Sequence, residues 1–166
     1  MTFLSDIWKP FFPTTAPASK VARQDNTIKL VRSELEKIRK HHNDVSSLFI
    51  EMRDKALNQK AKKIQDLADS LKHGLRHEVV LLLKFRDLLT KLKVKIEFIE
   101  QFYGSLSNDT IDEINRVSSK ELIEDIVTFY PTQGGMNNSP RYQILRKIYT
   151  NLAEIIEQLT KQFEPR

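Results

Sequence analysis

The chain has 166 residues, of which 40% are hydrophobic and 30% charged, and its formal net charge is +5 at pH 7. It has no cysteine, which excludes disulfides and cysteine-based metal or redox sites and suits a cytoplasmic protein. We expect neither a secretory signal nor a membrane-spanning helix, because no apolar run approaches the roughly 18 residues that a span needs. Between Ala18 and Tyr130 the only helix breakers are Gly74 and Gly104, so an almost entirely helical domain is predicted.

Basic residues are concentrated in the first part of the chain. Residues 1–103 contain 20 Lys and Arg against 13 Asp and Glu, whereas residues 104–166 contain 7 against 9. A basic front half indicates an anionic partner such as phospholipid or nucleic acid, and an acidic rear half can fold back over the same surface. For any single charged residue, solvation of a long helix is the simpler interpretation. The difference between the two halves is the stronger signal.

The first twelve residues combine a strong apolar face with few polar groups. At helical spacing they place Phe3, Leu4, Ile7, Trp8, Phe11 and Phe12. Such a segment is expected to lie at a lipid interface, where Trp favours the headgroup level. Docking into a groove of its own bundle or of a neighbouring subunit is an equal alternative. Residues 13–20, PTTAPASK, are predicted to be a linker.

From Val21 to about Leu57 the apolar spacing is that of a long amphipathic helix. Its seam contains Ile28, Val31, Leu35, Ile38, His42, Val45, Phe49, Met52 and Ala56. Beside the seam runs a row seven residues apart, formed by Arg32, Arg39, Ser46 and Arg53. A basic residue near an anionic membrane contributes about 1 kcal/mol, so useful affinity needs several. The cations predicted to contact a membrane are Lys20, Arg23, Lys29, Arg32, Arg39 and Lys40.

The seam fails between Asn58 and Lys62 and resumes in a new register at Ile64. We interpret this break as the turn of an antiparallel helical hairpin, and the alternative is one continuous helix with a stutter. A second arm from Ala61 to Tyr103 would be about 65 Å long at 1.5 Å per residue. Its apolar positions are Leu82, Phe85, Leu89, Leu92, Ile96, Ile99, Tyr103 and, beyond the arm, Leu106. The predicted fold is therefore an elongated bundle built on a long hairpin.

Shorter helices are expected to complete the core, residues 21–130. One starts at Asn108, and another starts at Ser118 or Ser119 with Glu121 in a capping box. Residues 131–140 are predicted to be a flexible loop, after which Ser139 and Pro140 start an amphipathic helix over residues 141–166. Its apolar face contains Leu145, Ile148, Leu152, Ile155, Leu159 and Phe163. We expect this helix to dock on its own hairpin or to be transferred to a partner.

Few residue groups indicate catalysis or cofactor binding. His73 and His77 are four residues apart, a spacing that could hold a metal ion on a helix. Apart from Glu78 no third ligand is close, so a solvated pair is the favoured interpretation. The HExxH zinc motif and phosphate-binding loops are absent from the sequence. We therefore expect no enzyme activity and no cofactor. His42 lies in the seam, where its protonation could lower stability.

These patterns resemble the ESCRT-III family, most closely the archaeal cell-division CdvB paralogues. The resemblance covers about residues 20–130. It rests on the basic arm LVRSELEKIRKHHNDVSSLFIEMRDKAL and the second arm KAKKIQDLADSLKHGLRHEVVLLLKFRDLLTKLKVKIEFIEQF, followed by a short capped helix. It implies a cytoplasmic protein, peripheral at the membrane, that polymerises to remodel or cut membranes in cell division or vesicle budding. Later helices would straighten onto the long arm in the open form.

The resemblance also implies partners. They are an anionic membrane surface, further copies and paralogous subunits, and a disassembling AAA ATPase that recognises the last helix. Here the closing segment LAEIIEQLTKQF has Gln158 where the family has a basic residue, so an intramolecular role for residues 144–163 is favoured. The alternative function is a soluble helical-bundle or coiled-coil adaptor. Nucleic-acid binding is not expected, because acids interleave with the bases of the first arm.

Overall fold

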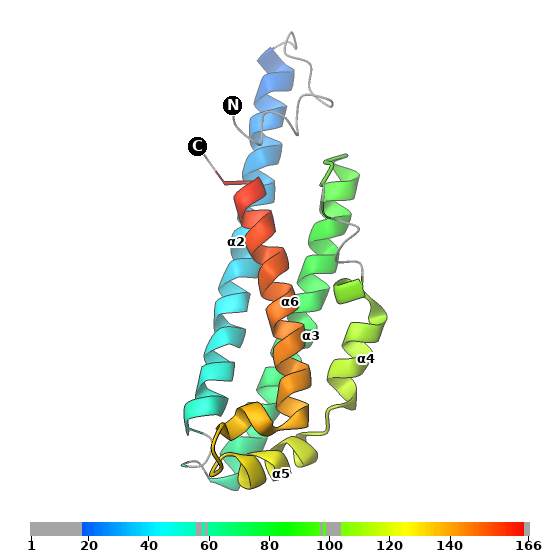
Figure 1. The fold of residues 1–166 in the computed structure, drawn as a ribbon. Coiled ribbons are helices and arrows are strands. Elements are labelled where there is room, and N and C mark those ends of the chain that lie inside the picture. The colour runs from blue at the N-terminus through cyan, green and yellow to red at the C-terminus, as the bar shows by residue number, and fades with distance from the viewer. Residues whose placement is uncertain (1–17, 56–57, 59, 97, 99–103, 165–166) are drawn as a thin grey trace.

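The structure is a computed structural model that describes residues 18–55, 58, 60–96, 98 and 104–164, with the backbone only for residues 18–25, 55 and 61. Two long helices, α2 (Ala18–Lys55) and α3 (Ala61–Lys91), lie side by side and shorter helices cover them (Figure 1). At 1.5 Å per residue, α2 is about 57 Å long and α3 about 46 Å. All secondary structure in the described residues is helical, so the predicted all-α hairpin with shorter C-terminal helices is confirmed.

The hairpin is antiparallel, and its turn lies at the predicted break. α2 ends at Lys55 and α3 begins at Ala61, which rules out a continuous helix with a stutter. Across the hairpin, a Cβ built on Gly74 would lie only 2.9 Å from the Val45 Cγ2 atom, so the two backbones approach closely there. The described seam positions of α2 are buried except for the half-buried Ile28 and His42. They meet the buried α3 residues Leu67, Leu71, Leu75, Leu82, Phe85 and Leu89.

The predicted extension of the second arm to Tyr103 is wrong. α3 ends at Lys91, and the chain leaves it through a Schellman motif in which Val94 N–H donates to Leu89 O (2.9 Å) and Lys93 N–H donates to Thr90 O (3.0 Å). Lys93 itself takes the left-handed conformation, with φ of 57°. The β-branched Val94 has low helix propensity and is buried beyond the helix end. Apolar spacing therefore identified buried positions here, but not a helix.

The next two helices pack on α3 close to their predicted positions. After the 3₁₀ helix η3 (Gly104–Leu106) come α4 (Asn108–Arg116) and α5 (Ser119–Phe129). The N-cap of α4 is Ser107, one residue before the predicted Asn108. Ser118 caps α5 by accepting a bond from Glu121 N–H at 3.5 Å, as expected. In Figure 1, α4 runs along α3 and α5 crosses near the hairpin turn.

The last helix, α6 (Pro140–Gln162), packs on both arms of the hairpin. Ser139 is its N-cap and Pro140 its first residue, as predicted. The segment before it, predicted to be a flexible loop, contains a 3₁₀ helix, η4 (Gly135–Asn138), which packs on α5 and α6 and buries Met136. The predicted linker also differs in part, because α2 already begins at Ala18. All six predicted apolar positions of the last helix are buried: Leu145, Ile148, Leu152, Ile155, Leu159 and Phe163.

Candidate functional site

The position of α6 decides which side of the hairpin is open. A groove between α2 and α6 is lined by Arg32 and Arg39 from α2 and by Thr160 and Phe163 at the end of α6. A second groove, here called the hairpin groove, has a volume of about 230 Å³ and contains no α6 residue. Its lining consists of Leu30, Glu34, Lys37, Ile38, Leu81, Lys84, Phe85 and Leu88. The hairpin groove therefore opens on the side that α6 leaves uncovered.

The arginine row predicted to bind lipid lies toward α6. The Arg32 Nε–H donates to the backbone oxygen of Phe163 at 3.1 Å and so fastens the end of α6. Arg39 forms an exposed ion pair with Glu36 at 3.4 Å and faces the groove beside α6. Arg53 forms a short ion pair with Asp54 (2.7 Å), whose hydrogen bond raises the pKa of the arginine. These side chains have intramolecular partners and do not form one open basic flank.

Other predicted cations are placed differently. Lys29 and Lys40 are exposed on α2. Lys37 lines the hairpin groove. At about 100° per residue, Lys40 lies about 60° from Lys37 around the helix axis, whereas Lys29 lies between the two sides, about 80° from Lys37 and about 60° from Arg32. The side chains of Lys20 and Arg23 lie outside the described residues, as does the whole apolar segment with Phe3, Leu4, Ile7, Trp8, Phe11 and Phe12.

Three histidines, here called the histidine cluster (His41, His73 and His77), adjoin the hairpin groove. The His41 Nε2–H donates to Gly74 O at 2.8 Å, and the His41 ring meets the edge of His77 with centroids 4.7 Å apart. The rings of His73 and His77 are parallel at 6.4 Å. Burial lowers the pKa of His77, and the nearby His41, His73 and Lys84 lower it further. The three rings and Lys84 therefore lie close together on one surface.

The described histidines and carboxylates do not assemble a metal site. Among the described residues, no three His, Asp or Glu side chains come together in a way that could hold an ion. Glu78, the one acidic neighbour considered as a third ligand for His73 and His77, is fully buried and bonded to His42 instead. The side chains of His73 and His77 are both exposed.

The half-buried His42 of α2 and the fully buried Glu78 of α3 form a polar pair between the two arms of the hairpin. The Nδ1 atom of His42 lies 2.5 Å from Oε1 of the fully buried Glu78, whose Oε2 atom has no partner among the described residues. Tyr149 of α6 stacks on the His42 ring at 4.9 Å and 3°. The pair therefore connects α2 and α3 beneath a ring of α6. Sequence reasoning did not predict that Glu78 pairs with His42, although its place three residues after Leu75 and four before Leu82 is a seam position.

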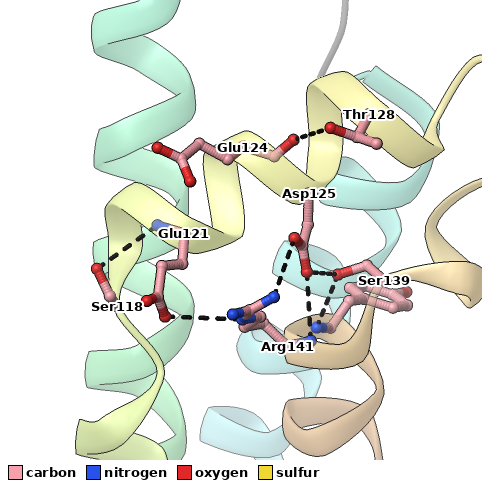
Figure 2. A network of polar contacts seen from close by, with 8 residues as sticks. Ser118, Glu121, Glu124, Asp125, Thr128, Ser139 and Arg141 are labelled. Carbon is pink, nitrogen blue, oxygen red and sulfur yellow. Dashed lines mark hydrogen bonds and ion pairs between the residues drawn. The ribbon is translucent and has the colours of Figure 1, made fainter.

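A second polar network fastens the start of α6 (Figure 2). The buried Asp125 accepts a hydrogen bond from the Ser139 Oγ–H at 2.8 Å and bonds from Arg141 at 3.4 Å. Ser139 in turn accepts from Tyr142 N–H at 3.1 Å, and Arg141 reaches Glu121 at 3.6 Å. Sequence reasoning missed Asp125, which lies on the apolar face of α5. Together with the bond from Arg32 to Phe163, this network holds α6 at both ends.

Comparisons of the chain with protein-family models, with curated proteins and with solved structures found no match. No helix in the described part of the chain is long and apolar enough to cross a membrane. The functional inference therefore rests on two observed features. One is a set of contacts that fastens α6 to the hairpin, and the other is an open hairpin face with exposed cations and partly exposed leucines.

Proposed function

We propose that this chain is a peripheral membrane protein that binds anionic lipid and assembles with copies of itself, as an ESCRT-III-like protein of cell division or vesicle budding would. The observation that carries the proposal is the open hairpin face, where lysines border a groove lined by leucines. Leu30 in this groove is 45% exposed, and Leu81 and Leu88 are half-buried. A face with both features fits a lipid surface, which offers anionic headgroups above an apolar layer.

The charges on this face favour binding at an anionic surface. Lys29, Lys37, Lys40 and Lys84 are exposed, and the exposed acidic residues beside them on α2 are Glu36 and Asp44. The ion pair of Lys37 with Glu34, at 2.8 Å, is itself exposed and contributes little, so it does not prevent contact with a headgroup. At about 1 kcal/mol for each cation, four of them would strengthen binding by roughly a thousandfold at low ionic strength. Added salt should weaken this binding strongly.

The apolar residues 1–12 are the second membrane signal in this proposal. Stable anchoring of a peripheral protein generally needs two signals, and a basic face combined with an inserted apolar segment is one such pair. Trp8 and the phenylalanines of this segment would enter the lipid interface while the hairpin face contacts headgroups. Deleting residues 1–12 should therefore weaken vesicle binding without unfolding the helical body.

In this proposal α6 stabilises the monomer and is not freely available to a partner. Six large apolar side chains of the segment are buried, and at about 1.5–3 kcal/mol for each side chain their exposure would cost on the order of 10 kcal/mol. An ATPase that reads the apolar face of α6 could bind it only after undocking. Straightening of the later helices onto α3 would likewise require the Schellman motif at Lys93 to open.

Co-sedimentation with vesicles tests the membrane proposal. The triple variant Lys29→Gln, Lys40→Gln, Lys84→Gln removes charge from the open face. The matched variant Lys120→Gln, Lys147→Gln, Lys161→Gln removes the same charge from exposed sites on α5 and α6. We expect the first triple to lose about 100-fold in affinity for anionic vesicles and the second only a few-fold. Equal losses would show that net charge, and not the hairpin face, drives binding.

The alternative function is a soluble helical adaptor whose hairpin groove receives a protein. The observation in its favour is that the groove is short and lined by partly exposed leucines that a protein segment could also cover. Electron microscopy and solution scattering separate the two functions. Filaments that form with anionic vesicles support the membrane proposal, whereas a monomer that ignores vesicles and never polymerises supports the adaptor.

A further inference from the structure

The open face of the hairpin contains histidines as well as lysines. His41 follows Lys37 by one turn of α2, and His77 precedes Leu81 by one turn of α3, so the histidine cluster continues the hairpin groove along the molecule. His73, Arg76 and His77 line a shallow depression that Val80 and Ile111 complete. The histidines of α2 and α3 and the neighbouring Ile111 of α4 therefore form one continuous surface.

Few acidic groups accompany these histidines. No hydrogen bond or ion pair between described residues joins a carboxylate to His41, His73 or His77, and Glu78 is bonded to His42 instead. Protonated, the three rings would be like charges separated by 4.7 and 6.4 Å, beside Arg76 and Lys84. The charged groups on the elements that meet here are Lys37, Lys40 and Asp44 of α2, Asp69, Arg76, Glu78 and Lys84 of α3, and Asp112 of α4, with Asp69 bonded to Ser119.

We propose that the histidine cluster makes the hairpin face a pH-dependent binding surface for the phosphates of anionic lipids, with affinity that rises as the pH falls below neutral. The inference rests on the membrane function proposed above and identifies which residues regulate it. Protonation of the rings creates positive charge that the described contacts leave uncompensated, and a layer of lipid phosphates supplies the missing negative charge. Bound phosphate in turn favours the protonated rings, so proton uptake and lipid binding strengthen each other.

The neighbouring apolar groups select a lipid surface over a free anion. Leu30, Leu81 and Leu88 are partly exposed in the adjoining groove, so the face offers apolar contact next to its charge. A membrane satisfies both requirements at once, whereas inorganic phosphate satisfies only the charge. The depression at His73 and His77 is open, with a volume of about 240 Å³ that a headgroup phosphate can enter from the surface.

The test measures binding of the full chain to vesicles containing phosphatidylserine at pH 7.5, 6.5 and 5.5 and constant ionic strength. Each added charge should strengthen binding by about fivefold, so we expect the wild type to bind at least tenfold more tightly at pH 5.5 than at pH 7.5. In the variant His73→Gln, His77→Gln, the affinities at pH 5.5 and pH 7.5 should differ much less. Both side chains are exposed, so the variant should remain folded, which circular dichroism checks.

Fixed positive charge provides the converse test. The variant His73→Arg, His77→Arg should bind at pH 7.5 about as tightly as the wild type does at pH 5.5. As a matched control, Lys29→Gln, Lys40→Gln should weaken binding at every pH and leave the ratio of the affinities at pH 5.5 and pH 7.5 unchanged. If the variant His73→Gln, His77→Gln kept the wild-type ratio of affinities at pH 5.5 and pH 7.5, the inference would be overturned, because other groups would then cause the pH dependence.

Failure of the inference and failure of the proposed function give different results. A wild-type chain that binds anionic vesicles equally at all three pH values retains the membrane function and loses the histidine switch. A chain that binds them at no pH loses both. Competition by millimolar inorganic phosphate, or equal pH-dependent binding to RNA, would overturn the assignment to lipid. Lack of such competition, with binding confined to vesicles, supports it.

Discussion

Replacement of His42 by Leu should strongly destabilise the protein, because it isolates a buried carboxylate. Glu78 is 0% exposed, its Oε1 atom has His42 as its partner at 2.5 Å, and its Oε2 atom has none among the described residues. Removing the partner of a buried hydrogen-bonding group typically costs about 1–3 kcal/mol, and more for a charged group, since the remaining group keeps its desolvation penalty. Part of the stacking on Tyr149 is also lost.

Removing both polar groups should recover most of that loss. In the double variant His42→Leu, Glu78→Met the interface becomes apolar, and such replacements are often neutral or stabilising by about 1–4 kcal/mol. Urea unfolding followed by circular dichroism gives the free energies of the four proteins in the double-mutant cycle. His77→Leu, at an exposed ring, is the control and should change stability by less than about 1 kcal/mol. A loss below about 1 kcal/mol for His42→Leu would refute the reasoning.

Four further predictions concern other contacts. Asp125→Ala should cost about 2–3 kcal/mol in urea unfolding, because it removes bonds from two partners at the start of α6, and Asp125→Asn should cost less. Lys93→Gly should stabilise by about 0.5–1 kcal/mol by relieving a left-handed backbone, whereas Lys93→Ala should give no such gain. Gly74→Ala should destabilise by about 1 kcal/mol, since the added methyl would lie 2.9 Å from Val45, and adding Val45→Ala should reduce the clash. The pKa of His77 in the folded chain is lowered from 6.5, so as the pH falls the unfolded chain takes up the proton first. The free energy of unfolding without vesicles should therefore decline from about pH 7 to pH 5, and it should decline less in His77→Gln.

The caps and most buried positions could be predicted from the sequence because they depend on neighbours along the chain. Ser118 and Ser139 precede their helices by one residue, and the first-arm seam from Val31 to Met52 follows from repeats of three and four residues. The same spacing could not show where α3 ends. A period of apolar residues reports that a position is buried, and Ile96 is buried outside any helix.

The sequence by itself determined the all-α class, the hairpin turn and the apolar face of the last helix, since each follows from local spacing and local breaks in that spacing. The tertiary structure decided which charges face outward. Arg32 contacts Phe163, a residue 131 positions away, and this docking of α6 covers the arginine side of α2 and leaves the lysine and histidine side open. It also paired His42 with Glu78, because only the register of two packed helices brings their polar seam positions together. Apolar spacing along one helix predicts that a side chain is buried, but packing between segments distant in the sequence determines which residue contacts it.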